Sequence, residues 1–144
     1  MDKKRILIVE DEAAISKALS CRLEKLGFKV SVAQDGQEGL EEVKRRRPDL
    51  LILDLVLPAL PGEEVCKAIR ESDDEGLAAL PIIMLTAKSS DADHCIGKVL
   101  GANSYVTKPF RTDSLLKEIR RLIGAVLIFL GLSAFPFTQG FAVQ

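Results

Sequence analysis

Short runs made only of apolar residues recur along this chain, and they limit the fold more than any other feature of the sequence. Residues 6–9 and 50–53 are two such runs, each bounded by charged residues. A run of this kind is typical of a strand that is buried on both faces, as in a parallel sheet covered by helices. Residues 28–33, 81–85 and 104–106 predict three further strands.

Helical patterns separate these strands. The expected helices cover residues 15–26, 35–46, 62–71 and 89–100, and a last one begins near residue 112. Gly27 is expected to end the first helix, and Asp35 with Glu38 three residues later is expected to start the second. Thr112 is the expected N-cap of the last helix. Strands that alternate with helices predict an α/β fold, a doubly wound five-stranded parallel sheet with right-handed connections.

The overall composition excludes several classes of function. With 144 residues the chain fits one domain, and its net charge of −1 gives no sign of binding to nucleic acid or to an anionic membrane. The three cysteines lie far apart and there is one histidine, so we expect neither a zinc site nor a disulfide framework. The apolar run at 6–9 is too short for the core of a signal peptide, and we therefore expect a cytoplasmic location.

Functional side chains follow four of the predicted strands, where ligand sites lie in folds of this class. They are Glu10 and Asp11 after the first strand, Asp54 after the third, Thr86 at the fourth and Lys108 after the fifth. Three converging carboxylates repel one another unless a cation lies between them, and one lysine cannot neutralise three anions. Mg²⁺ prefers carboxylate and phosphate oxygens, and an aspartate can accept a phosphoryl group. The sequence therefore predicts a magnesium site beside a phosphoryl acceptor.

Five motifs in the expected order make the chain similar to a known family. They are IVEDE at 8–12, LDLVLP at 53–58, the single residue Gly62, LTA at 85–87 and YVTKPF at 105–110. Together they resemble the receiver domain of bacterial two-component response regulators, over roughly residues 4–121. The resemblance implies a flavodoxin-like receiver fold with the strand order 2-1-3-4-5, as in the single-domain chemotaxis receivers.

The resemblance also implies a role for each matching residue. Asp54 matches the phosphoryl acceptor, and Glu10, Asp11 and the backbone carbonyl of Val56 match the ligands that hold Mg²⁺ together with Asp54. Lys108 matches the lysine that contacts the phosphoryl oxygens. Thr86 and Tyr105 match the pair of switch residues, and Pro109 matches a position that often follows a cis peptide bond.

The implied function is a phosphorylation-dependent signalling switch. A sensor histidine kinase or a phosphotransfer protein would donate the phosphoryl group to Asp54. An output protein would then bind the face formed by the fourth helix, the fifth strand and the last helix. On this view the domain catalyses only its own phosphotransfer and slow dephosphorylation, and it has no direct contact with nucleic acid.

An aspartyl-phosphate phosphohydrolase is the alternative, since such enzymes also combine Asp, Thr or Ser, Lys and Mg²⁺. They usually place a second acid two residues after the nucleophile. That position is Val56 in this chain, which disfavours the enzyme.

The last part of the sequence differs from the rest. Residues 122–144 carry no charge and include four of the six phenylalanines, so we divide the chain into a receiver domain at 1–121 and an apolar extension at 122–144. The apolar stripe of the last helix could continue to about residue 134. Three roles stay open for the extension: a dimer contact with a second copy, no function of its own, or a membrane anchor. The anchor is disfavoured because the unbroken apolar run is short and Pro136 follows it.

Overall fold

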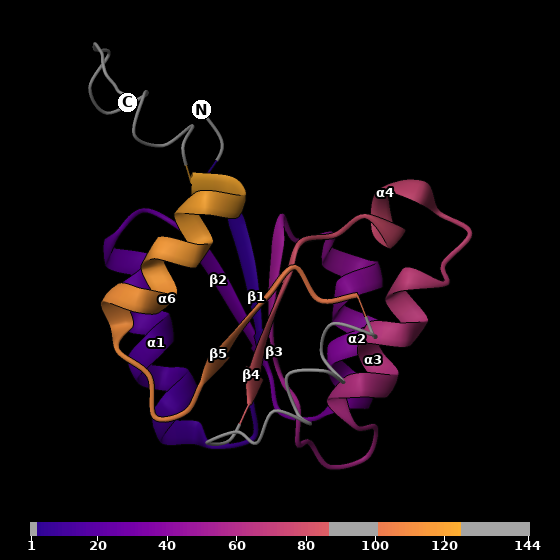
Figure 1. Ribbon diagram of the computed structural model, residues 1–144, viewed down its shortest axis with the longest axis horizontal. Helices are drawn as coiled ribbons and strands as arrows, with labels where there is room; N and C mark the ends of the chain where they lie inside the picture. Colours follow the sequence, from indigo (N-terminus) through magenta and orange to yellow (C-terminus); the bar gives the residue numbers. More distant parts are fainter. Residues whose placement is uncertain (1–2, 87–100, 125–144) are drawn as a thin grey trace, which may run out of the picture.

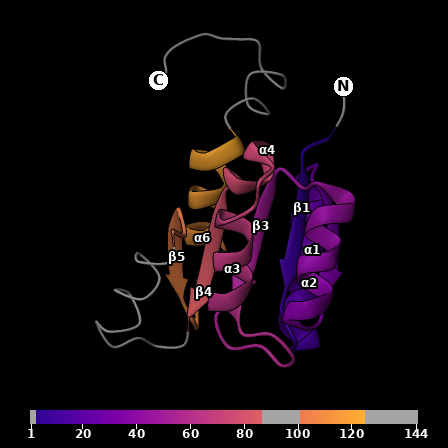
Figure 2. The ribbon, with the colours of Figure 1, turned by 90° about the vertical axis from the view of Figure 1, so that its right-hand side faces the viewer.

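The computed structural model describes residues 3–86 and 101–124. Within them, five parallel strands form one sheet in the order β2-β1-β3-β4-β5, with β5 at one edge (Figure 1, Figure 2). The strands are β1 (Arg5–Val9), β2 (Lys29–Ala33), β3 (Leu50–Asp54), β4 (Ile82–Thr86) and β5 (Ser104–Thr107). The predicted fold class and strand order are confirmed.

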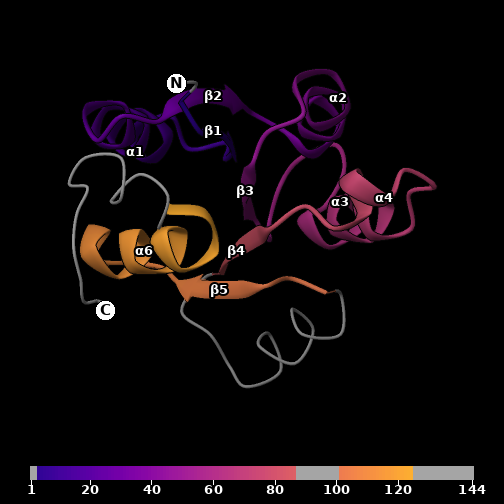
Figure 3. The same cartoon turned by 90° about the horizontal axis from the view of Figure 1, so that it is seen from above.

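Helices cover both faces of the sheet. One face carries α1 (Ala13–Lys25) and α6 (Thr112–Ile119), and the other carries α2 (Gly36–Arg46), α3 (Gly62–Arg70) and the short α4 (Glu75–Ala78). Seen from above, the molecule has three layers, with the strands between the two groups of helices (Figure 3). This layering explains why the strands are apolar along their whole length, because a strand between two helix layers has no face in water.

Alternate residues of each strand pack into two hydrophobic clusters, one on each face of the sheet. In β1, Leu7 and Val9 belong to the cluster that includes α2 and α3, while Ile6 and Ile8 belong to the cluster that includes α1 and α6. All four side chains are fully buried. The sheet therefore forms a rigid support for the residues that follow its strands.

Local signals explain how the first two helices begin or end. Gly27 follows α1 with a φ of 100°, a left-handed conformation that costs glycine little. The side chain of Asp35 accepts a hydrogen bond of 2.8 Å from the backbone N–H of Glu38 at the start of α2. The Glu38 carboxylate in turn accepts one of 2.9 Å from the N–H of Gln34. The predicted end of α1 and start of α2 are confirmed.

The predictions for the later helices need two corrections. Thr112 is not an N-cap: Arg111 has the extended backbone of that position, and Thr112 already lies inside α6, which has no side-chain cap. The short helix α4 was not predicted, because four residues are too few to show a helical period. Asp74 caps α4 by accepting a hydrogen bond of 3.1 Å from the N–H of Leu77.

Two predictions concern residues that the structure does not describe. They are the helix predicted over 89–100 and the continuation of the last helix beyond residue 124. Up to that point, α6 passes into a π-helical turn, η1 (Arg120–Gly124), whose Leu122 and Ile123 pack against the core. Along residues 3–86 and 101–124, no helix has both the length and the apolar character needed to span a membrane.

Candidate functional site

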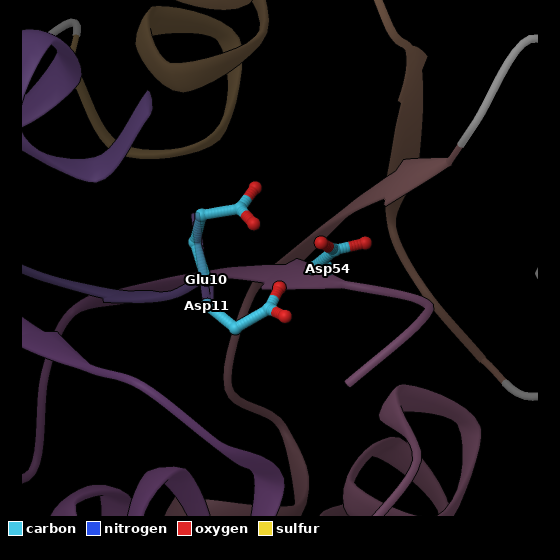
Figure 4. Close-up of side chains that lie close together, drawn as sticks. All are labelled: Glu10, Asp11 and Asp54. Atoms are coloured by element: carbon cyan, nitrogen blue, oxygen red, sulfur yellow. The ribbon is translucent and has the colours of Figure 1, made fainter. Parts of the chain in front are cut away.

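Three carboxylates meet at the carboxyl edge of the sheet. Glu10 and Asp11 follow β1 directly, and Asp54 is the last residue of β3, the strand that pairs with β1. One oxygen of each carboxylate lies within 4.8 Å of the others, and the three side chains gather around one small space (Figure 4). Glu10 is fully buried and Asp54 is 5% exposed, whereas Asp11 is exposed. The topology thus brings together the acidic residues that the sequence predicted to converge.

Lys108 supplies the positive charge at this cluster. Its Nζ atom lies 2.7 Å from Glu10 Oε1 and donates a hydrogen bond of 2.9 Å to Asp54 Oδ2. The backbone N–H of Lys108 donates to the carbonyl of Thr86, and the peptide bond from Lys108 to Pro109 is cis, as the resemblance implied. Glu12 was not singled out from the sequence, yet its carboxylate is 3.9 Å from the same Nζ. Glu12 is the last residue of the IVEDE motif, but the motif alone does not indicate this proximity, which depends on the fold.

Burial and pairing shift the pKa values of two members of the site. Burial raises the pKa of Glu10, and this effect outweighs the opposite influence of Lys108. Burial alone would lower the pKa of Lys108, but the hydrogen bonds to Glu10 and Asp54 raise it on balance. Lys108 therefore remains an ammonium group, and Glu10 takes up a proton more readily than an ordinary glutamate.

The loop between β3 and α3 keeps Asp54 in place. The Asp54 Oδ1 atom accepts a hydrogen bond of 3.1 Å from the backbone N–H of Val56, a residue whose side chain is largely exposed. Gly62 closes the loop, because its N–H donates to the Leu55 carbonyl at 3.0 Å. A β-carbon on Gly62 would lie only 2.2 Å from the carbonyl oxygen of Asp54. A glycine eight residues after Asp54 is therefore a steric requirement of this loop.

Thr86, the last residue of β4, has a buried hydroxyl group without a hydrogen-bond partner in the described structure. The residue is 1% exposed, and its Oγ1 atom has no hydrogen-bond partner among the described residues. Buried hydroxyl groups normally have a hydrogen-bond partner. Because the Thr86 hydroxyl has none in the described structure, it could donate a hydrogen bond to an oxygen atom of a ligand. Tyr105 lies on the neighbouring strand, opposite Met84, and packs half-buried against the cluster that includes α3.

The carboxylates form a set of donors that could hold a divalent metal ion. Hard cations such as Mg²⁺ bind carboxylate oxygens and fill their remaining positions with water or phosphate oxygens. Glu10, Asp11 and Asp54 offer one oxygen each within a small space, and the exposed Asp11 leaves that space open to solvent. The single ammonium of Lys108 leaves this cluster with an excess of negative charge, which favours a cation.

Comparison with known proteins assigns the chain to a family. The family described as the response regulator receiver domain matches residues 6–120. Among curated relatives, the alkaline phosphatase synthesis transcriptional regulatory protein PhoP of Bacillus subtilis is 41% identical over 124 residues, 86% of this chain and 48% of that protein. The response regulator MprA of Mycobacterium leprae is 43% identical over 119 residues, 83% of this chain and 50% of that protein.

Solved structures agree with this assignment. The chemotaxis protein CheY4 of Vibrio cholerae has a TM-score of 0.78 and 33% identity, with 85% of this chain and 100% of that chain covered. The receiver domain of the sensor histidine kinase PA1611 from Pseudomonas aeruginosa PAO1, solved with a magnesium ion in its active site cleft, has a TM-score of 0.77 and 32% identity. That match covers 85% of this chain and 99% of the PA1611 domain.

The chain belongs to the response regulator receiver domain family. It is therefore a signalling domain of the two-component systems, and the strand-end motifs identified the family correctly. It spans about half the length of the curated relatives it matches.

Replacing Glu10 by glutamine is expected to change how the stability of the metal-free domain depends on pH. A carboxyl group whose pKa is raised by folding stabilises the fold while protonated, and this contribution is lost as the pH rises through the raised pKa. For Glu10 the contribution is full below its ordinary pKa of 4.5 and is lost above it. Urea unfolding in EDTA, from about pH 4 to about pH 8, should therefore show the variant gaining stability relative to wild type as the pH rises. A difference that does not vary with pH would contradict this prediction.

Proposed function

We propose that this domain is a phosphorylation switch in which Asp54 attacks the phosphorus of a phosphorylated histidine on a partner protein. The O–P bond to Asp54 forms while the P–N bond breaks, and the partner's histidine leaves as the free imidazole. The observation that carries the proposal is the arrangement around Asp54, whose Oδ2 atom is 2.9 Å from the Lys108 ammonium and whose neighbours are two further carboxylates. Phosphoryl transfer depends mainly on position and charge stabilisation, and this site offers both.

Magnesium is the proposed cofactor. Glu10, Asp11, Asp54 and the backbone carbonyl of Val56 would hold it, with the exposed Asp11 as the most accessible side-chain ligand. When bound, the ion neutralises the carboxylates and the incoming phosphoryl oxygens. Lys108 would contact the same oxygens from the other side, because its ammonium already lies against Asp54.

The response to phosphorylation is proposed to run through Thr86 and Tyr105. The unpaired Thr86 hydroxyl would donate a hydrogen bond to the phosphoryl group, and Tyr105 would move into the space that the threonine leaves. The face that changes would include β5 and α6, together with the helix predicted over 89–100. An output protein would recognise this face, in line with a shift between two existing conformations.

A hollow beside the site supports the proposed transfer from a histidine kinase or phosphotransfer protein, because a partner protein could bind there. This hollow of about 550 Å³ lies beside Lys108, and its walls come mainly from α1 and from the segment that joins β5 to α6. Its lining is mainly apolar and includes Ile15, Leu19, Pro109 and Phe110. Such a surface fits an apolar patch of a partner that brings its phosphohistidine to the site.

The proposed domain division keeps residues 1–121 as the receiver and 122–144 as an extension, for which contact with a second copy of the chain is the favoured role. The alternative enzyme, an aspartyl-phosphate phosphohydrolase, has less support. Val56, where that enzyme would have its general acid, is an apolar residue with 71% of its surface exposed. We therefore propose that the domain catalyses only its own phosphotransfer and slow dephosphorylation.

Phosphorylation of Asp54 can be tested directly with acetyl phosphate as the donor. Intact mass spectrometry should show the addition of one phosphoryl group in the presence of Mg²⁺, and no addition in EDTA or in the Asp54→Ala variant. Asp73→Ala removes an exposed aspartate between α3 and α4 and should behave as wild type. An adduct of equal yield on Asp54→Ala would refute the assignment of the acceptor.

Replacing Thr86 by alanine is expected to separate phosphorylation from its consequence. The hydroxyl does not attack phosphorus, so the yield of the adduct should stay close to that of wild type. The change in NMR chemical shifts around Tyr105 on phosphorylation should fall to less than about half, because a hydrogen bond to a charged group is lost. If the variant shows the full shift of wild type, the switch does not depend on Thr86.

A further inference from the structure

The guanidinium group of Arg70 joins three separate segments of the chain. Arg70 is the last residue of α3 and is half-buried. Its Nε atom donates a hydrogen bond to the carbonyl of Gly101, its Nη1 atom to the carbonyl of Ala78, and its Nη2 atom to Oδ1 of Asn103, each at 2.9 Å. One side chain therefore ties the end of α3 to α4 and to the segment that leads into β5.

Arg70 differs from the surface arginines that pair with carboxylates, although Arg5 also donates to backbone carbonyls, those of Arg46 and Arg47. Arg45, Arg47 and Arg121 pair with carboxylates at the surface. Arg70 has no carboxylate partner among residues 3–86 and 101–124, and burial lowers its pKa. An arginine that gives up part of its hydration for three neutral oxygens is acting as a structural link, since ion pairing does not account for its position.

Asn103 is the point at which this link reaches the sheet. Its backbone N–H donates a hydrogen bond of 2.9 Å to the carbonyl of Ile82, and its Oδ1 accepts one of 2.8 Å from the N–H of Ile82. Arg70 donates to the same Oδ1 and so fixes the orientation of the Asn103 side chain. Together these contacts set the start of β5 against the start of β4.

Several contacts hold β5 in its register. β5 is an edge strand of four residues, all of them half-buried, and β4 is its only neighbouring strand in the described sheet. Tyr105 and Val106 pack into the clusters on opposite faces of the sheet, and the Ser104 hydroxyl donates a hydrogen bond of 2.7 Å to Glu118. A slip of one residue would turn each side chain to the opposite face. The contacts of Arg70 and Asn103 add a link at the start of this short strand, where it meets the start of β4.

The same register places Lys108 at the functional site. With Ser104 opposite Ile83, Thr107 lies opposite Thr86, and Lys108 then donates its backbone N–H to the Thr86 carbonyl. From there the Lys108 ammonium reaches Asp54. We propose that Arg70 is a positioning residue for the phosphorylation reaction: through Asn103 it holds β5 in the register that brings Lys108 to Asp54. The inference rests on the proposed function, because it assigns Lys108 a role in the transfer.

The test compares Arg70→Met, which keeps the apolar stem without donors, with Arg70→Lys and with Arg22→Met. Arg22 is an exposed arginine of α1, and its variant is the matched control. Two quantities are measured well below the unfolding temperature: the rate of phosphorylation by acetyl phosphate with Mg²⁺, and amide hydrogen exchange by NMR. For Arg70→Met we expect phosphorylation to slow by about tenfold or more, as misplacement of a catalytic group predicts. Exchange should accelerate at Ile82 and Asn103 by about tenfold relative to Leu7, whereas Arg70→Lys should be intermediate and Arg22→Met unchanged.

Several results would overturn the proposal. If Arg70→Met phosphorylates at the wild-type rate, Arg70 contributes to stability alone, whatever happens to hydrogen exchange. If phosphorylation slows while exchange at Ile82 and Asn103 relative to Leu7 is unchanged, Arg70 does not act through the register of β5. Should Arg70→Met fail to fold, Arg70→Lys and Asn103→Ala answer the same two questions. A wild-type domain without any adduct would refute the proposed function instead, and the exchange measurement would still test the effect of Arg70 on the register of β5.

Discussion

Replacing Lys108 by methionine is expected to lower the free energy of unfolding of the metal-free domain by about 3 kcal/mol, the lower end of what removing one partner of a buried ion pair costs. Glu10 is fully buried and its nearest cation is the Lys108 ammonium, at 2.7 Å. Without Lys108, the buried Glu10 carboxylate must either stay charged beside the carboxylates of Asp11 and Asp54 or take up a proton. The lower end of the range applies because the Lys108 side chain is 18% exposed and solvent reduces the effect.

Urea unfolding at neutral pH in EDTA measures this loss. Lys117→Met is the matched control, because Lys117 is an exposed lysine of α6, and its replacement should change the stability by less than about 0.5 kcal/mol. Mg²⁺ should restore more stability to Lys108→Met than to wild type, since it replaces a missing positive charge. The rate of phosphorylation should also fall by about a hundredfold, the usual effect of losing one donor to the transferred group. Equal stability of wild type and Lys108→Met in EDTA would contradict this account of the site.

Replacing Gly36 by alanine is expected to destabilise the domain by about 3 kcal/mol, the upper part of the usual range for overpacking. A β-carbon on Gly36 would lie 1.7 Å from the carbonyl oxygen of Leu60 and 2.7 Å from the carbonyl carbon. Side-chain rotation cannot relieve a clash with backbone atoms, so α2 and the loop after β3 would have to move apart. That movement would also break the hydrogen bond of 3.2 Å from the Gly36 N–H to the Pro58 carbonyl.

Thermal unfolding followed by circular dichroism should show a fall in Tm of about 12 °C for Gly36→Ala, given roughly 4 °C per kcal/mol for a domain of this size. Gly76→Ala is the matched control within α4, where the added β-carbon would meet no atom closer than 3.4 Å. Its Tm should stay within about 2 °C of wild type or rise slightly, because alanine favours a helix. Equal Tm values for Gly36→Ala and Gly76→Ala would contradict this prediction. They would show that α2 and the loop after β3 can move apart with little loss of stability.

Much of this fold could be predicted because its signals are local. The apolar runs that became β1 and β3 are short and bounded by charges, and the Asp35 cap of α2 depends on residues three positions apart. The carboxylates at the strand ends could be predicted to meet, because parallel strands end at one edge of the sheet. Recognition of the family rested on the spacing of the same residues.

Other features depend on contacts between distant residues and left no local signal. The approach of Gly36 to Leu60 joins the start of α2 to the loop after β3, and nothing in either segment alone indicates it. The role of Arg70 likewise depends on the backbone carbonyls of Ala78 and Gly101. Every residue has a backbone carbonyl, so the residue types at these positions give no signal. Thr112 has the residue type of an N-cap, but the backbone placed Arg111 there instead. A residue type can predict a capping role only when the path of the chain is known to within one residue.

The backbone carbonyl and the side-chain hydroxyl of Thr86 have different contacts, and this separation limits which atoms would have to move in the proposed switch. Its carbonyl is engaged by the Lys108 N–H, whereas its hydroxyl is unpaired in the described structure. In the proposed switch, the hydroxyl would therefore turn toward a phosphoryl group by rotation about one side-chain bond, with the hydrogen bonds between β4 and β5 intact. The energetic cost of the active conformation would then fall on the packing around Tyr105, and the sheet itself would serve as a fixed frame in both conformations.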